Sequence, residues 1–317
     1  MTEGILNINK PQNMTSHDVV AIARRTLGIK KIGHTGTLDP MATGVLPICI
    51  GKSTRIIEYL DMDLKAYRCT MRLGLMTDTQ DIWGTVIDER PVQCTEEEIR
   101  KAFTGFSGVI WQKPPMYSAL KVNGKKLYEY AREGKDVDVK RRQIYINSLK
   151  IEEICMEKQE ITFTVECSKG TYIRTICQDI GEKLGCLATL TALTRTKSGI
   201  FSIEDSLELD AFRQMSKAAV ESRMLKSAEP LWAFGKVVTD QINGLRFAAG
   251  WHLSLEDCHI VKRPAFEERE FFLPMRDEFR RAYNVFGEIE GEEVFLGVAF
   301  YNGQYKKLVA DKVFYVR

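Results

Sequence analysis

Residues 31–47 read KIGHTGTLDPMATGVLP, and this stretch places three Gly and two Pro around a single carboxylate, Asp39. Pro40 restricts the residue before it to extended conformations, and the flanking glycines allow tight turns. The stretch therefore predicts a loop over residues 31–51 that presents Asp39 in a fixed position. A carboxylate held in this way is a candidate nucleophile or base. An Asp before Pro is also a common turn former, so the motif alone leaves both interpretations open.

Regular elements are predicted before this loop. Residues 4–10 have the pattern of a short strand, which runs into a turn that contains Pro11. Ser16, or Thr15, can cap a helix that continues through residue 27, and Gly28 is suited to end that helix in a left-handed conformation. The chain therefore enters the loop from a strand followed by a helix.

The middle of the chain mixes strands and helices. Alternating apolar and polar residues predict strands, and a T-x-x-E capping box with later Gly residues predicts helices. The expected strands cover residues 67–73 and 161–167, and the expected helices cover 96–105, 126–132 and 172–184. Because these elements follow no regular strand–helix–strand rhythm, the sequence predicts an α+β fold with a mixed, mostly antiparallel central sheet flanked by helices.

A second, smaller unit is predicted at the C-terminal end. Residues 207–232 read as a helical connection, and short strand patterns with a turn at Asn302-Gly303 follow it. We place the boundary near Phe234, which divides the chain into a unit of residues 1–234 and a β-rich unit of residues 235–317. A length of 317 residues agrees with about two domains.

Composition excludes several classes of protein. Hydrophobic residues make up 44% of the chain and charged residues 28%, which are values of globular proteins. No apolar run approaches the about 18 residues of a membrane helix, and no secretory signal is visible, so we expect a cytoplasmic protein. The 8 Cys lack C-x-x-C spacing and the 4 His lack an H-E-x-x-H pattern, so we expect reduced thiols and no metal site.

Charge is unevenly distributed along the chain. Residues 121–150 hold nine Lys and Arg against four Asp and Glu, and residues 305–317 hold four against one. Basic blocks in a nearly neutral chain are typical of a face that binds a polyanion, although solvated surfaces give the same pattern. Two segments resemble phosphate-binding motifs but are incomplete. Gly51-Lys52-Ser53 lacks the earlier Gly of a P-loop, and Gly33-His34-Thr35-Gly36 lacks the second His of a nucleotidyl-transfer motif.

Residue identities between Lys10 and Gly185 carry more information than these patterns. Five ordered blocks resemble the signature motifs of the TruB-type tRNA pseudouridine-55 synthases. The blocks are Lys10-Pro11 with Thr15-Ser16; residues 31–47; residues 65–68 with 73–74 and 77–81; residues 112–121 with Gly124, Tyr128, Ala131-Arg132 and Gly134; and residues 167–174 with 179–181 and 184–185.

This resemblance implies a fold, an activity and a set of catalytic residues. The family has the pseudouridine-synthase fold and isomerises a uridine in the T-loop of tRNA, position 55, with base flipping and without a metal or other cofactor. Asp39 falls on the family's catalytic aspartate, Tyr67 on its active-site tyrosine and Arg174 on its active-site arginine.

The resemblance also implies residues that bind the substrate. His34 falls on a residue that helps to hold the target nucleotide out of the stack, and Tyr172 and Leu193 fall on the uracil pocket. Lys10, in the opening motif, is assigned to substrate binding. The C-terminal unit is similar to a PUA-like RNA-binding domain that grips the tRNA through phosphate contacts. The implied partner is the T-arm of tRNA, and we expect a monomer with no membrane and no obligate protein partner.

These roles agree with the chemistry of the residues. Breaking an N-glycosidic bond develops positive charge on the sugar, which a carboxylate at Asp39 can stabilise or trap. Attack of Asp39 on the base ring is the alternative, and the sequence leaves both routes open. An arginine such as Arg174 would keep a buried carboxylate ionised, and the ring of Tyr67 offers a face for a flipped base.

Taken singly, each of these residues has a structural interpretation. Tyr67 and Leu193 fit a strand core, His34 fits a solvated loop, and Arg174 fits a surface pair with Asp179. The joint resemblance favours the functional interpretation.

Two positions depart from the family pattern. Thr194 precedes Arg195 where the family usually has two basic residues, and Thr189 stands where it often has an aromatic residue or His. We expect both near the RNA face.

Three other functions are weighed against this interpretation. They are a non-catalytic RNA-binding or RNA-folding protein on the same scaffold, a pseudouridine synthase with another RNA target, and a phosphate-handling NTPase. Intact Asp39 disfavours the first, and the incomplete P-loop disfavours the last.

Overall fold

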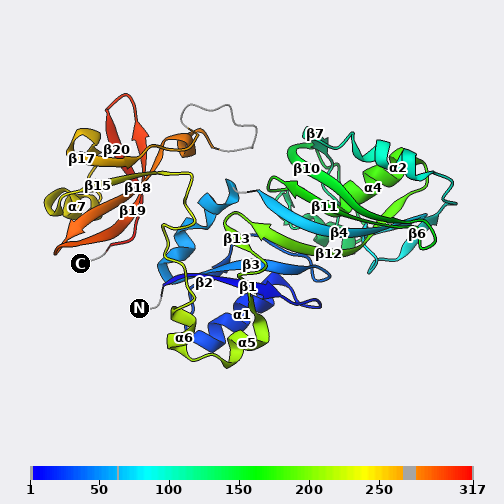
Figure 1. Cartoon of the computed structure of the whole chain (residues 1–317), viewed down its shortest axis with the longest axis horizontal. Helices are drawn as coiled ribbons and strands as arrows, with labels where there is room; N and C mark the ends of the chain where they lie inside the picture. The colour runs from blue at the N-terminus through cyan, green and yellow to red at the C-terminus, as the bar shows by residue number, and fades with distance from the viewer. Residues whose placement is uncertain (1–2, 63, 267–275, 316–317) are drawn as a thin grey trace.

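The computed structural model describes residues 3–62, 64–266 and 276–315 (Figure 1). Among these residues, ten strands form a larger sheet and six form a second sheet in the C-terminal part of the chain. The C-terminal sheet, gold to red in Figure 1, lies to one side of the larger sheet. No helix in the described part of the chain is long and apolar enough to cross a membrane.

The larger sheet is mixed and mostly antiparallel, as predicted. The strand pairs β1–β14 and β3–β12 are parallel, and the other pairs along the sheet are antiparallel. The order of its strands is β14 (Leu207–Glu208), β1 (Gly4–Lys10), β3 (Thr43–Ile50), β12 (Ala188–Ser198), β4 (Lys65–Leu73), β11 (Glu160–Cys167), β10 (Arg142–Cys155) and β7 (Gly108–Gln112). Off this path, β2 (Ile32–His34) pairs with β3, and β13 (Phe201–Ser202) pairs with β12.

Helices cover this sheet in two groups. One group packs α4 (Ile173–Leu184) on β12 and β4 with α2 (Glu96–Phe103) beside it, and the other packs α1 (Ser16–Leu27) next to β2 with α5 (Leu209–Gln214) beside it. The capping prediction for α1 is confirmed, because Thr15 forms a capping box with Asp18 and Gly28 ends the helix at φ 67°. The remaining helices of this part are η1 (Gly51–Met62), α3 (Leu127–Arg132) and α6 (Lys217–Glu221).

Two short hairpins lie outside the sheets. One pairs β5 (Leu75–Thr77) with β6 (Val86–Glu89), and the other pairs β8 (Lys121–Val122) with β9 (Lys125–Lys126).

The prediction of one continuous loop over residues 31–51 is wrong. Only residues 35–42 lie between strands, since β2 and β3 occupy the two ends of that segment. β3 is buried along nearly its whole length, and its Gly, Thr and Pro content hides this apolar run in the sequence. Gly44 has φ 103°, and a Cβ there would lie 2.2 Å from the carbonyl oxygen of Arg195, so glycine permits β3 to approach β12.

The second sheet has the order β16 (Leu253–Ser254), β20 (Lys307–Val313), β19 (Glu292–Asn302), β18 (Ala282–Ile289), β15 (Gly235–Thr239) and β17 (Cys258–Lys262). It is accompanied by α7 (Gln241–Ala248), η2 (Leu255–Asp257) and η3 (Asp277–Arg281). Its first strand begins at Gly235, and the division into units of residues 1–234 and 235–317 stays a prediction.

An apolar cluster joins the two sheets. We call it the junction cluster; it contains buried residues of β1, β3, η1 and the C-terminal sheet. At its centre the Tyr59 ring makes edge contacts with Phe234, Phe279 and Phe300, with centroids 5.3, 5.4 and 6.4 Å away. The Tyr59 hydroxyl also donates a hydrogen bond to Asp311. The described parts of the two sheets are therefore packed on each other and not merely tethered.

Candidate active site

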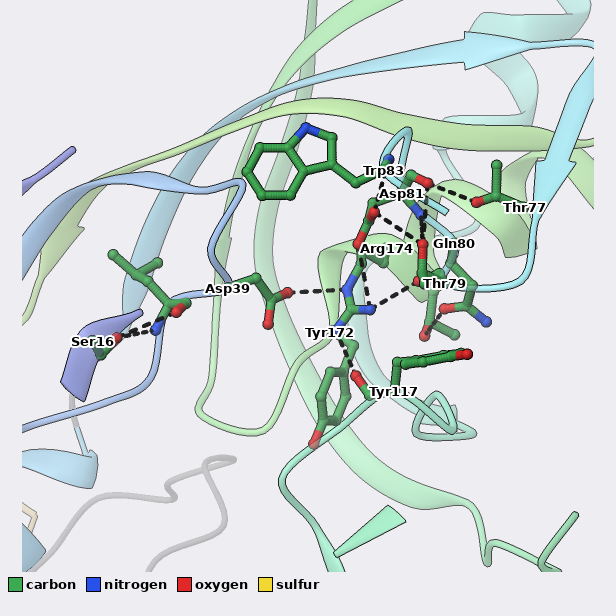
Figure 2. A network of polar contacts seen from close by, with 12 residues as sticks. Ser16, Asp39, Thr77, Thr79, Gln80, Asp81, Trp83, Tyr117, Tyr172 and Arg174 are labelled. Atoms are coloured by element: carbon green, nitrogen blue, oxygen red, sulfur yellow. Dashed lines mark hydrogen bonds and ion pairs between the residues drawn. The ribbon is translucent and has the colours of Figure 1, made fainter. Parts of the chain in front are cut away.

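The segment that carries Asp39 is anchored on both sides of the carboxylate. Leu38 and Met41 are buried in the core under the sheet. Ser16 Oγ accepts a hydrogen bond from Leu38 N at 2.8 Å and donates one to Leu38 O at 3.2 Å, as Figure 2 shows. Ala42 N donates to Asp39 O at 3.0 Å, which closes a turn around the carboxylate. The helix start at Ser16 thus fixes the backbone next to Asp39.

Arg174 is buried and forms an ion pair with the partly exposed Asp39. Arg174 lies in the first turn of α4, is 4% exposed, and places Nε 3.0 Å from Asp39 Oδ2. Its Nη1 donates to Thr79 O at 2.8 Å and its Nη2 to Tyr117 O at 2.9 Å. Because each nitrogen of the guanidinium has an oxygen partner, the cation is fixed in one orientation (Figure 2). The alternative of a surface pair with Asp179 is wrong.

Asp81 is a second carboxylate on the same arginine, and the sequence interpretation did not assign it a role. Its Oδ2 lies 3.6 Å from Arg174 Nη1, and its Oδ1 accepts hydrogen bonds from Thr79 Oγ1 at 2.9 Å and Trp83 N at 3.1 Å. Burial raises the pKa of Asp81, while Arg174 opposes that rise. The sequence offered one signal for Asp81, which is its place in the block at residues 77–81. A buried arginine such as Arg174 requires anionic partners, and a carboxylate in another block could supply one.

A cavity of about 710 Å³ opens beside the ion pair and is lined by five of the predicted residues. These are Asp39, Tyr67, Tyr172, Arg174 and Leu193. Tyr117, Tyr128, Arg142 and Lys169 also line it and were not predicted as site residues. The volume lies within the range of about 300–1,000 Å³ that small-molecule sites occupy, so a single nucleoside fits the dimensions.

Tyr67 lies at the cavity wall beside a second buried arginine, Arg195. Tyr67 is 9% exposed on β4 and lines the same cavity as Arg195. Arg195 Nε donates to Val45 O at 2.6 Å. Burial raises the pKa of Tyr67 to about 12, so its hydroxyl is neutral at physiological pH. Tyr67 therefore presents an uncharged aromatic wall, and Arg195 is a support that sequence reasoning missed.

Tyr172 is positioned by Gln112, which is buried on β7. Gln112 Oε1 accepts a hydrogen bond from Tyr172 N at 2.8 Å, and Gln112 Nε2 donates to Tyr172 O at 3.0 Å. This two-point contact fixes the backbone at the start of α4, directly before Arg174. The pairing joins residues far apart in the chain, and no local pattern announces it.

Two predicted substrate-binding residues are not among the described residues that line the cavity. Lys10 is fully buried, and its Nζ donates to Pro11 O at 2.9 Å and Met14 O at 2.7 Å. Burial lowers the pKa of Lys10 to about 8, although the nearby Asp39 charge opposes this. In this geometry Lys10 supports the turn before α1, and its role in substrate binding stays a prediction.

His34 lies on β2, packed edge to face on His17 with ring centroids 5.6 Å apart. Burial, followed by the charges of His17 and Arg195, lowers the pKa of His34 to about 4. Its Nδ1 is buried and has no hydrogen-bond partner among the described residues. His34 is therefore neutral at physiological pH, and it is not among the described residues that line the cavity.

The two positions that depart from the family pattern differ in place. Thr189 is fully buried and its Oγ1 donates to Leu75 O at 3.0 Å, so its side chain is covered, and its place near the RNA face stays a prediction. Thr194 is half-buried, and its hydroxyl lies 2.9 Å from that of Thr43 across the β12–β3 pair. Both threonines bond within the sheet.

The chain is similar to known proteins of one family. Residues 24–173 match the family model of the TruB family pseudouridylate synthase N-terminal domain, and residues 174–231 match that of the tRNA pseudouridylate synthase B C-terminal domain. A Clostridium novyi protein named tRNA pseudouridine synthase B is 51% identical over 281 residues, which cover 86% of this chain and 96% of that protein. A Clostridium perfringens protein of the same name is 42% identical over 297 residues, covering 93% of this chain and 94% of that protein.

Solved structures show the same fold. The chain is similar to one in the crystal structure of a Cbf5–Nop10–Gar1 complex, with a TM-score of 0.69 and 25% identity, covering 98% of this chain and 84% of that one. A chain of an H/ACA RNP bound to a substrate RNA containing 2′-deoxyuridine has a TM-score of 0.70 at 21% identity, covering 99% and 86%.

Proposed function

The chain belongs to the TruB family of pseudouridylate synthases, and we propose that its substrate is tRNA, its target the T-loop uridine at position 55, and its catalytic group Asp39. The enzyme isomerises uridine to pseudouridine. The N1–C1′ bond of the nucleoside breaks, a C5–C1′ bond forms, C5 loses a proton and N1 gains one. The reaction neither adds nor removes atoms and involves no net redox change, so its demands are positioning, charge stabilisation and proton transfer.

Asp39 and Arg174 meet the demand for charge stabilisation. Asp39 Oδ2 is 3.0 Å from Arg174 Nε, and Asp39 lines the cavity while its side chain stays 36% exposed. The arginine holds the carboxylate in one position, next to the place where the sugar or the base becomes electron-poor. Asp81 balances the second side of the guanidinium and so fixes its direction.

The cavity walls meet the demand for positioning. Tyr67, Tyr172 and Leu193 surround the space next to Asp39 and present two rings and an aliphatic side chain. Extrusion of a base costs a few kcal/mol, and stacking on an aromatic ring returns about 1–3 kcal/mol per base. We assign these three residues to the flipped uracil. We assign His34, which is neutral and packed on His17, to holding the target nucleotide out of the stack.

Basic side chains around the cavity support an RNA substrate. Arg142 and Lys169 line its rim, and Arg142 belongs to the basic block of residues 121–150. Phosphate contacts supply much of the affinity of RNA-binding proteins, and displaced loop bases supply recognition. The names of the relatives support tRNA in particular. We further propose that the C-terminal sheet acts as a PUA-like grip on the tRNA, and that the protein works as a cytoplasmic monomer.

The observation that carries this proposal is the Asp39–Arg174 pair opening on an aromatic-walled cavity. Its test is an unmodified tRNA transcript with one radiolabelled uridine at the T-loop position, incubated with protein in EDTA, digested and chromatographed. We expect label in pseudouridine, and none when a neighbouring uridine carries the label. Tight tRNA binding without conversion would contradict the proposed target and would favour another RNA substrate for the enzyme.

A further inference from the structure

The loop between β5 and β6 exposes apolar side chains beside the active site. Trp83 is 49% exposed and Ile82 is 39% exposed. Single exposed apolar residues are common on protein surfaces and need no explanation by themselves. The rigidity and the position of Trp83 distinguish it from such residues.

The loop is closed by its own hydrogen bonds. Asp78 N donates to Thr85 O at 3.0 Å, and Thr85 N donates to Asp78 Oδ1 at 2.8 Å. Ile82 N donates to Leu190 O at 2.9 Å, which ties the tip of the loop to β12. A Cβ at Gly84 would lie 2.4 Å from Asp78 Oδ1, so the loop closes as tightly as glycine permits. The exposed indole is therefore attached to a fixed backbone.

Trp83 is linked to the catalytic carboxylate through two shared side chains. Asp81 Oδ1 accepts a hydrogen bond from Trp83 N at 3.1 Å, and Asp81 Oδ2 lies 3.6 Å from Arg174 Nη1. Arg174 Nε in turn lies 3.0 Å from Asp39. In Figure 2 the indole projects from this loop toward the side of the site where Asp39 lies. Trp83 is exposed and is not among the described residues that line the cavity, so its ring lies outside the cavity on the side of Asp39.

We propose that Trp83 is a positioning residue that stacks on the base of a nucleotide adjoining the target uridine. The inference rests on the proposed function, since it needs an RNA strand entering this cavity. When one base is extruded, its neighbour loses a stacking partner, and a ring beside the cavity replaces it. A ring on a pre-ordered loop does so with little loss of conformational freedom on binding. The loop between β5 and β6 then contacts a neighbouring base, whereas the cavity walls contact the flipped uracil.

The first experiment measures binding of an unmodified T-arm stem-loop to proteins that also carry Asp39→Asn, so that the RNA stays unconverted. Stacking worth about 1–3 kcal/mol predicts that Trp83→Ala weakens the Kd by about 5- to 150-fold, and that Trp83→Phe keeps most of the affinity. Trp111→Ala is the matched control, because Trp111 is 58% exposed on β7 and is not among the described cavity residues. Equal affinity of the Trp83→Ala and Trp111→Ala proteins would overturn the inference.

A second experiment excludes a purely structural effect. Stem-loops that lack the base 5′ or 3′ of the target uridine are bound to the Asp39→Asn protein with and without Trp83→Ala. We expect one missing base to weaken binding when Trp83 is present and to cost nothing further in its absence. Equal costs in the two proteins would overturn the stacking role.

Conversion of the intact stem-loop by the wild-type protein, measured alongside, separates this inference from the proposed function. Conversion without coupling between Trp83 and either base overturns the Trp83 inference alone. Absence of both conversion and binding overturns the proposed substrate and the inference together.

Discussion

In the cleft, by which we mean the cavity beside Asp39, the buried Arg174 contacts two carboxylates and two backbone carbonyls. At the junction cluster, by contrast, Tyr59 is buried among three phenylalanine rings. Burying charge costs desolvation energy that ion pairing only roughly offsets, while burying aromatic surface contributes directly to stability. The cleft therefore holds a preorganised charge for chemistry, and the junction cluster supplies stability that holds the two sheets together. Substitutions in the two regions should separate these properties.

The largest effect is expected for Arg174→Met. This substitution should affect both stability and conversion, because Arg174 neutralises two carboxylates and also supports the chemistry at Asp39. Removing it leaves Asp39 and Asp81 without their cation, which costs about 3–5 kcal/mol of folding free energy for a broken buried pair. Loss of one charge-stabilising group should slow conversion by about 10²–10³-fold. Urea denaturation and single-turnover assays measure the two effects. Arg174→Lys is the control, which keeps the charge and recovers part of the stability; wild-type stability of Arg174→Met would contradict the assignment.

Tyr59→Ala sharpens the comparison from the other side. It removes the ring at the centre of the junction cluster and should cost about 3–5 kcal/mol, as for other buried aromatic residues. Conversion at saturating RNA, well below the unfolding temperature, should stay within about threefold of wild type because the cleft is untouched. Tyr59→Phe keeps the ring, loses only the hydrogen bond to Asp311 and should cost about 1 kcal/mol. A large loss of single-turnover rate in Tyr59→Ala would show that the regions are not separable.

Two buried serines give a matched pair. Ser16 Oγ bonds to the backbone of Leu38 beside Asp39. Ser53, in η1, has its Oγ 2.7 Å from Ser227 Oγ. Each change to Ala should cost about 1–3 kcal/mol through the partner left unsatisfied. Only Ser16→Ala should also slow conversion, by about tenfold, because the carboxylate is then less well placed. Equal rates in the two variants would mean that Ser16 does not position Asp39.

The smallest effect that we expect is a loss of folding stability at acid pH, which arises from His34. Burial lowers the pKa of His34 from 6.5 to about 4, so protons bind the unfolded chain first as the pH falls. Stability from this group is therefore complete above about pH 6.5 and falls below it, by about 2 kcal/mol at pH 5. His34→Gln should flatten the change in urea midpoint between pH 7 and pH 5. His252→Gln, at an exposed position, is the control and should leave that change as it is.

Local patterns predicted much of the fold. The strand at Gly4–Lys10, the helix at Ser16–Leu27 and the helix at Ile173–Leu184 follow from alternation, capping and terminal glycine. β3 was missed because its Gly, Thr and Pro residues obscure an apolar strand that is defined by its distant partners β1 and β12.

The site divides in the same way. Asp39 and Arg174 came from motif resemblance, and the structure brings them together. Asp81, Gln112 and Arg195 were missed as site supports because their contacts join positions far apart in the chain, which no periodicity encodes. Lys10 was assigned to substrate binding from its place in the opening motif, whereas its ammonium group donates to the nearby carbonyls of Pro11 and Met14.

The central claim is that Asp39 performs the chemistry while the remaining cleft residues bind and orient the RNA. Its most direct test is single-turnover conversion of the T-loop-labelled tRNA by wild type and Asp39→Asn, with RNA affinity and urea midpoint measured on the same samples. The account predicts unchanged RNA binding, a smaller loss of stability than Arg174→Met because Arg174 keeps Asp81 and two carbonyl partners, and conversion slowed by about 10⁴-fold or more. Conversion by Asp39→Asn within about tenfold of wild type would contradict it.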